Sequence, residues 1–99
     1  MPTDKADELR EVKDLWPLIE PLIGELTWTA AHMATDFAYA LDGYHGGSMR
    51  SEMEAKFRKG EAEHGRGWLT MSEGDLQQEV QQELQDLVLY LCMMSLRFS

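Results

Sequence analysis

The chain has 99 residues, which are enough for one domain with a hydrophobic core, and we expect that domain to span residues 1–99. Aspartate and glutamate total 18 residues against 9 lysines and arginines, so the formal net charge is -9. An acidic protein repels a phosphate backbone, and only bridging cations would allow such a contact. Direct nucleic-acid binding is therefore not expected.

Three features of the sequence bear on its compartment. Cys92 is the single cysteine, so no internal disulfide can form and a buried, unreactive thiol is expected. The first residues are charged rather than apolar, and the most apolar run, residues 15–26, is interrupted by prolines and acids. These features predict a soluble, cytoplasmic protein that does not associate with membranes.

Two prolines mark expected helix boundaries in the first part of the chain. Thr3 can cap a short first helix, which Pro17 then ends or kinks. Pro21 can begin a second helix that runs towards Asp42, before the glycine-rich turn that starts at Gly43. The apolar residues of this second helix recur at steps of three and four: Leu22, Leu26, Ala30, Met33, Phe37 and Leu41.

A third helix is predicted after the glycine turn. Ser48 can cap it, and Gly65 is placed to stop it after His64. Gly60 lies in its interior, where glycine costs about 1 kcal/mol relative to alanine. We expect either a neighbouring helix or a ligand close to Gly60, or a break that splits the helix in two. Residues 66–71 should form a loop whose tryptophan and leucine fold back over the protein.

The longest predicted helix runs from Ser72 to Phe98. Ser72 and Asp75 have the spacing of a capping box, in which each satisfies a backbone N–H of the other. The expected apolar face consists of Leu76, Val80, Leu84, Leu87, Val88, Leu91, Met94 and Phe98. No strand-like alternation occurs, so we expect an all-α fold: a compact antiparallel bundle of three or four helices. Its excess apolar surface predicts a homodimer with the last helix in the seam.

Three acids, Glu79, Glu83 and Asp86, follow one line of this last helix. They can simply face solvent, as acids beside an apolar stripe usually do. However, residues 67–96 contain no lysine or arginine that could pair with them. Clustered carboxylates are ligands for Mg²⁺, or alternatively Mn²⁺, and such ions commonly bridge to phosphate groups. The row therefore raises the hypothesis of phosphate chemistry.

Two stretches extend this hypothesis to a family. Residues 56–65 (KFRKGEAEHG) precede a short loop with Trp68, and residues 79–90 (EVQQELQDLVLY) follow it. Together they resemble the small MazG-like proteins, of the type found in phages and mobile elements, of the all-α nucleoside triphosphate pyrophosphohydrolase superfamily. In that family a Glu-x-x-Glu pair and a Glu-x-x-Asp pair on the next helix hold Mg²⁺. Glu83 and Asp86 match the second pair and Glu63 matches half of the first, but position 60 is glycine.

The resemblance implies a Mg²⁺-dependent nucleotide-binding protein that could hydrolyse nucleoside triphosphates to the monophosphate and pyrophosphate. The metal ligands would be Glu63, Glu79, Glu83 and Asp86. Glu63 and His64 would be the catalytic residues, with His64 orienting a phosphate or water. Lys56 and Lys59 would contact phosphate oxygens. Trp68 would stack on a base, although covering the core is an alternative role for it.

The alternative from another functional class is a non-catalytic helical protein of a phage or mobile element that binds a host protein. The 7 methionines would suit an adaptable apolar binding surface. They would equally suit the core or a dimer seam.

Overall fold

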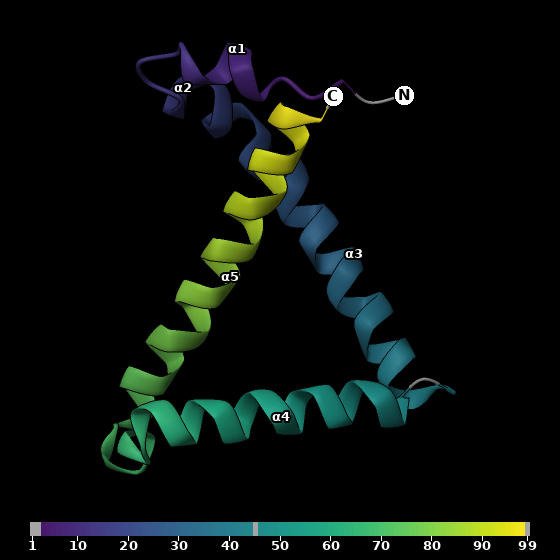
Figure 1. The fold of residues 1–99 in the computed structure, drawn as a ribbon, viewed down its shortest axis with the longest axis vertical. Coiled ribbons are helices and arrows are strands. Elements are labelled where there is room, and N and C mark those ends of the chain that lie inside the picture. Colours follow the sequence, from purple (N-terminus) through teal and green to yellow (C-terminus); the bar gives the residue numbers. More distant parts are fainter. Residues whose placement is uncertain (1–2, 45, 99) are drawn as a thin grey trace. The chain divides into compact units, whose positions relative to one another are not determined.

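The computed structural model describes residues 3–44 and 46–98, and its regular elements are helices (Figure 1). Two short helices come first, followed by three long ones, with single turns of 3₁₀-helix between some of them. In chain order they are α1 (Ala6–Arg10), α2 (Trp16–Ile19), η1 (Glu20–Leu22), α3 (Ile23–Asp42), α4 (Gly46–His64), η2 (Gly67–Thr70) and α5 (Glu73–Arg97).

The all-α prediction is confirmed for the described residues, which contain no named strand and only an isolated bridge between Asp4 and Phe98. Within the same residues, no helix combines the length and apolar character needed to cross a membrane. The antiparallel bundle, its MazG-like arrangement and the homodimer stay predictions.

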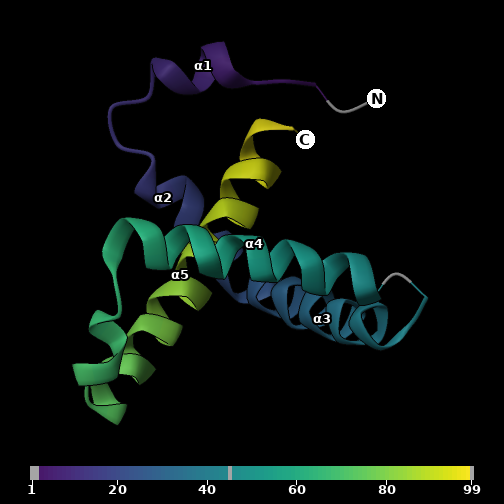
Figure 2. The ribbon, with the colours of Figure 1, turned by 60° about the horizontal axis from the view of Figure 1, so that its bottom comes forward.

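The chain divides into two compact units, which we describe separately. The terminal unit consists of Met1–His32 and Gln81–Ser99, and the central unit consists of Met33–Val80. In the terminal unit, Figures 1 and 2 both show the C-terminal part of α5 crossing the first turns of α3. The central unit contains α4, η2 and the remaining turns of α3 and α5.

The N-terminal prediction was wrong in two details. Thr3 does not cap α1; the Asp4 carboxylate instead accepts a hydrogen bond from the Ala6 N–H at 2.9 Å, next to the start of the helix. Pro17 does not end a helix either, because α1 stops at Arg10 and Pro17 lies in the first turn of α2. A proline costs little in a first turn, where the missing N–H would have no helical partner.

The ends of α4 follow from glycines. The helix begins at Gly46, two residues before the predicted cap Ser48. A Cβ atom at position 46 would collide with the Leu41 carbonyl, so this close turn requires glycine. At the other end the predicted stop is confirmed: Gly65 has φ +70 and its N–H donates to the Glu61 carbonyl at 2.8 Å.

The start of α5 confirms the predicted capping box. The Asp75 N–H donates to Ser72 Oγ at 3.1 Å, and the Ser72 N–H donates to Asp75 Oδ2 at 3.4 Å. Both bonds satisfy amides that have no partner inside the helix. The acidic residues of this first turn also suit the positive end of the helix dipole.

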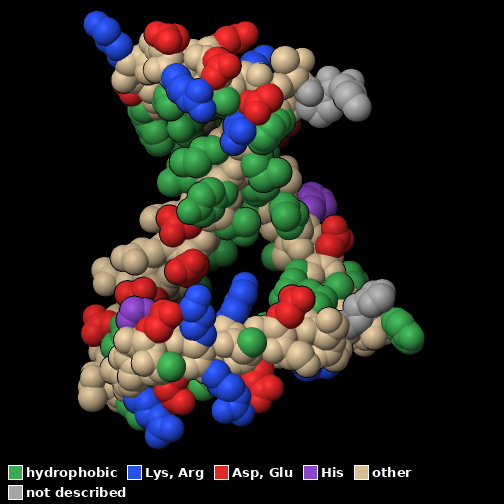
Figure 3. All heavy atoms as spheres, viewed as in Figure 1, with side chains coloured by type: hydrophobic (Ala, Val, Ile, Leu, Met, Phe, Trp, Pro, Cys, Tyr) green, Lys and Arg blue, Asp and Glu red, His purple; other side chains and the backbone are tan. Residues whose placement is uncertain are grey.

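The core of the terminal unit lies around Cys92, whose side chain is fully buried (0% exposed), and Ala30, which is 7% exposed. Hydrophobic side chains gather in this part of the molecule (Figure 3). The predicted apolar face of α5 was partly wrong, because Leu84 and Met94 are 55% and 58% exposed. The buried thiol is confirmed as free, and burial raises the pKa of Cys92.

A paired set of contacts joins the two ends of the chain within the terminal unit. The Arg97 guanidinium donates to both carboxylate oxygens of Asp4, each at 3.0 Å, and the Lys5 N–H donates to the Arg97 carbonyl at 2.7 Å. Arg97 also lies over the Phe98 ring, 4.7 Å from its centroid. The hydrogen bond from Arg97, together with that from the Ala6 N–H, lowers the pKa of Asp4.

Candidate functional site

The central unit contains a pocket of ≈ 380 Å³ at the C-terminal end of α4. One wall comes from the last turns of α4 and the other from the 3₁₀ turn η2 and its flanking glycines. Local sequence explains the shape, because the left-handed Gly65 ends α4 and lets the chain turn back at once. The lining residues are Lys56, Phe57, Gly60, Glu61, His64, Gly65, Gly67, Trp68 and Met71.

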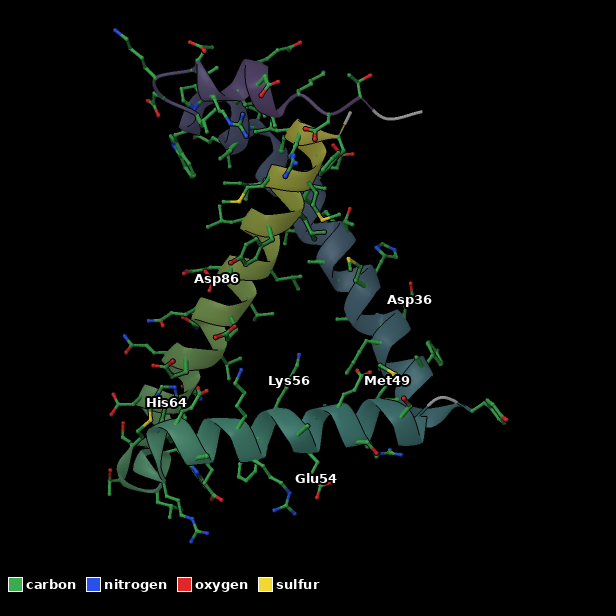
Figure 4. The ribbon with its side chains drawn as sticks, viewed as in Figure 1. Asp36, Met49, Glu54, Lys56, His64 and Asp86 are labelled. Atoms are coloured by element: carbon green, nitrogen blue, oxygen red, sulfur yellow. The ribbon has the colours of Figure 1, made fainter. Side chains whose placement is uncertain are left out.

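Three of the predicted site residues, Lys56, His64 and Trp68, line this one pocket. Figure 4 shows Lys56 and Glu54 on opposite sides of α4, and His64 at the end of the helix. Trp68 is 47% exposed, so its ring presents a large accessible apolar face in the pocket rather than covering a closed core. A cation, an imidazole and an aromatic face thus share one concave surface.

Gly60 lies on the α4 wall of the pocket. The helix continues through it, so the predicted break is wrong. The close helical neighbour is not observed either, because no heavy atom considered among the described residues lies within 4 Å of a Cβ built at position 60. Glycine instead leaves this wall bare, and a side chain could be added there without displacing the backbone.

Glu61 and Arg66 form an ion pair at the mouth of the pocket. Arg66 Nε donates to Glu61 Oε2 at 2.8 Å, across the turn made by Gly65. This pairing engages the Glu61 carboxylate with a cation. The contact fixes the turn beside the pocket, because it joins the last helical turn to the following loop.

Glu63 and Lys59 do not line the pocket. Lys59 Nζ lies 4.0 Å from Glu63 Oε1, one helical turn apart, and His64 Nε2 lies 3.7 Å from Glu63 Oε2. These side chains are largely exposed, so the pairing contributes little to stability. Glu63 therefore lies beside a lysine and a histidine of its own helix, in contrast to the acids of α5.

Glu79, Glu83 and Asp86 are exposed on α5, with Glu79 in the central unit and the other two in the terminal unit. Glu83 precedes the buried Cys92 by nine residues, or about two and a half helical turns, so it projects from the opposite side of α5. Among residues 3–44 and 46–98, no group of three or more histidine, cysteine, aspartate and glutamate side chains is arranged to hold a metal ion. The four-carboxylate site stays a prediction.

Sequence reasoning missed two pocket residues, Phe57 and Met71. Phe57 is 56% exposed. A detectable signal was its position one residue after Lys56 and three before Gly60, which places it on the helix wall beside the bare glycine. Met71 follows η2 and could be placed only once the turn was known.

Comparison of the chain with protein-family models, with curated proteins and with solved structures found no match.

Proposed function

We propose that the pocket of the central unit binds a nucleotide and that this binding depends on Mg²⁺. The observation that carries the proposal is the convergence of Lys56, His64 and Trp68 on one pocket of ≈ 380 Å³. That volume lies within the range of about 300–1,000 Å³ typical of small-molecule sites. An aromatic face beside a lysine and an imidazole suits a ligand with a flat base at one end and phosphate at the other.

Each of the three side chains has a defined task in this proposal. The Trp68 indole stacks on the base, an interaction that tolerates any base because each has a π-face. The Lys56 ammonium pairs with phosphate oxygens as a point charge. The His64 imidazole donates to another phosphate oxygen or orients a water.

The proposal includes Mg²⁺ because the protein and a polyphosphate ligand are both negatively charged. A polyphosphate adds negative charge to a protein whose net charge is already -9, and a bound divalent ion offsets that repulsion. When bound, such an ion also neutralises phosphate oxygens and can activate a water. The proposed ligands are carboxylates, which suit Mg²⁺ and also Mn²⁺: Glu63, Glu79, Glu83 and Asp86.

The binding test is the rise in melting temperature on adding nucleotides with and without Mg²⁺. A ligand that binds only the native state must raise it. Trp68→Ala should weaken nucleotide binding about tenfold or more, because stacking is worth about 1–3 kcal/mol per base. Leu69→Ala is the matched control, since Leu69 is adjacent, 62% exposed and outside the pocket lining. Equal effects of the two substitutions, or no nucleotide effect on the native protein, would contradict the proposal.

The proposed MazG-like catalysis lacks one of its expected metal ligands. Position 60 lacks the glutamate that would complete the first pair, so the geometry around the ion would depend on water. A misplacement of about 1 Å can cost about 100-fold in rate. We therefore expect Mg²⁺-dependent binding with slow or absent pyrophosphate release, in which Glu63 and His64 would be the catalytic residues.

Gly60→Glu tests this point directly. The bare wall at position 60 has room for the side chain, so the variant should fold and should release pyrophosphate faster, by up to about 100-fold. Gly60→Ala is the control, because it brings the same gain in helix propensity without a carboxylate. Fast turnover by the unaltered protein would show that another residue completes the site.

A second candidate, a non-catalytic interaction protein, is favoured by exposed apolar side chains. Met33 and Phe37, one turn apart on α3, are 48% and 46% exposed. Apolar surface of this kind commonly marks a protein interface, and a host protein or a second copy of the chain could cover it. Light scattering distinguishes these two, because only self-association gives a mass above 11.4 kDa for the isolated protein.

A further inference from the structure

The terminal unit carries its own pocket, a groove of ≈ 420 Å³ that no predicted site residue lines. Its lining comes from three helices: Trp16 of α2, Ile23 and Thr27 of α3, and chiefly Leu84 and Val88 of α5. Thr27 Oγ1 donates to the Ile23 carbonyl at 2.7 Å. The hydroxyl is therefore engaged within its own helix, and the groove is almost wholly apolar.

The groove has the spacing of a helix surface on both sides. Ile23 and Thr27 are four residues apart on α3, and Leu84 and Val88 are four apart on α5. Four residues of α-helix rise about 6 Å, so each wall is one turn long. Two apolar side chains at positions i and i+4 of another helix have the same spacing and can enter together.

The helices that form the groove carry more acids than cations. The sequence contains no lysine or arginine between Lys13 and Arg50, and none between Arg66 and Arg97. Residues 14–32 and 81–96 of this unit therefore carry acids and no lysine or arginine, and Lys13 and Arg97 stand at their ends. The acids are Asp14, Glu20, Glu25, Glu83 and Asp86.

We propose that this groove binds an amphipathic helix of a partner protein, with two apolar anchors one turn apart and lysines or arginines flanking them. The apolar walls supply affinity for the anchors, and the surrounding acids select cationic flanks. A second copy of the chain is a poorer occupant, because it would bring the same acids towards each other. The proposal concerns the terminal unit and does not depend on nucleotide binding.

The probe is a synthetic peptide of about 18 residues, long enough to be helical, with leucines on one face and lysines on the other. Trp16 lies in the groove and is 50% exposed, so it can report binding. In a protein carrying Trp28→Phe and Trp68→Phe it is the single tryptophan. Peptide binding should shift its emission to shorter wavelength, saturably, and should weaken as salt is raised.

Two further peptides separate charge from shape. A scrambled peptide with the same leucines and lysines but no apolar face should bind at least tenfold more weakly. A peptide with glutamate in place of every lysine should not bind at the same concentrations. If either control matched the first peptide, the proposed recognition would be wrong, because general charge attraction or general hydrophobicity would then explain the signal.

Leu84→Gln locates the binding site on the protein. It should weaken the leucine–lysine peptide at least tenfold, whereas Val80→Gln should not, since Val80 is as exposed (60% against 55%) on the same helix but outside the groove. Circular dichroism and melting temperature check that both variants fold. Equal effects of the two variants would overturn the proposal. A doubled mass in light scattering that Leu84→Gln abolishes would also overturn it, by showing that a second copy fills the groove.

Discussion

The two units differ in how far apart along the sequence their contacting residues lie. The ion pairs described in the central unit join residues no more than five apart, such as Glu61 with Arg66. In the terminal unit Asp4 and Arg97, which are 93 residues apart, form a two-pronged ion pair, and Cys92 is fully buried. Local contacts form wherever the helix forms, whereas distant ones require the chain to fold back on itself. The terminal unit should therefore carry the cooperative part of the stability.

We expect the largest loss of stability from a substitution at the buried Cys92. Cys92→Asp places a carboxylate where the side chain is 0% exposed, and we expect the free energy of unfolding to fall by about 4 kcal/mol or more. Met93→Asp is the matched control on the next residue, which is 48% exposed, with an expected change within about 0.5 kcal/mol. Urea unfolding measures both, and similar values for the two would refute the assigned core.

A glycine pair tests the central unit. Gly46→Ala should destabilise the protein by about 1–3 kcal/mol, because its Cβ would collide with the Leu41 carbonyl. Gly47→Ala meets nothing within 4 Å and should be neutral or stabilising by up to about 1 kcal/mol. Thermal unfolding of both variants gives the comparison. A stabilising Gly46→Ala would mean that the turn between α3 and α4 adopts another form.

The smallest effect concerns the exposed pair of Asp4 and Arg97. Arg97 and the Ala6 N–H lower the pKa of Asp4, so the folded value lies below the unfolded value of about 3.9. The pair therefore stabilises the folded protein at pH values above the unfolded-state pKa of Asp4. This stabilisation is lost as the pH falls through the folded-state pKa. Asp4→Asn should lower the free energy of unfolding slightly at neutral pH. It should also make that free energy fall less steeply as the pH is lowered.

Asp7→Asn is the control for that measurement, because Asp7 forms an ion pair with a neighbour three residues away, Arg10. Asp7→Asn removes a local contact and should change stability less than Asp4→Asn does. If Asp4→Asn and Asp7→Asn gave the same curve, the contact between the chain ends would contribute nothing distinctive.

The sequence predicted well where a short stretch of chain decides the outcome. The capping box of Ser72 and Asp75 and the stop at Gly65 are confirmed, since each depends on residues within one turn. The clustering of Lys56, His64 and Trp68 belongs to the same class: one helix end and one turn bring them together.

What the sequence could not predict depends on distant partners. The burial of Cys92 was predicted correctly, but periodicity did not show that Met94 stays exposed, because both lie on apolar stretches and only the packing partner distinguishes them. The Asp4–Arg97 ion pair could not be predicted from the spacing of neighbouring residues. The metal site needs carboxylates from two helices, so it remains a prediction for the same physical reason.

The pairing of Asp4 with Phe98 and Arg97 has a consequence for topology. The backbone at residues 4–5 runs beside that at residues 97–98, so a short peptide linker between these two segments could close the chain into a ring. Closing the ring would remove conformations mainly from the unfolded chain, which raises stability without adding any contact to the folded one. The Asp4–Arg97 ion pair and the bond from the Lys5 N–H to the Arg97 carbonyl already join the same two segments without a covalent link.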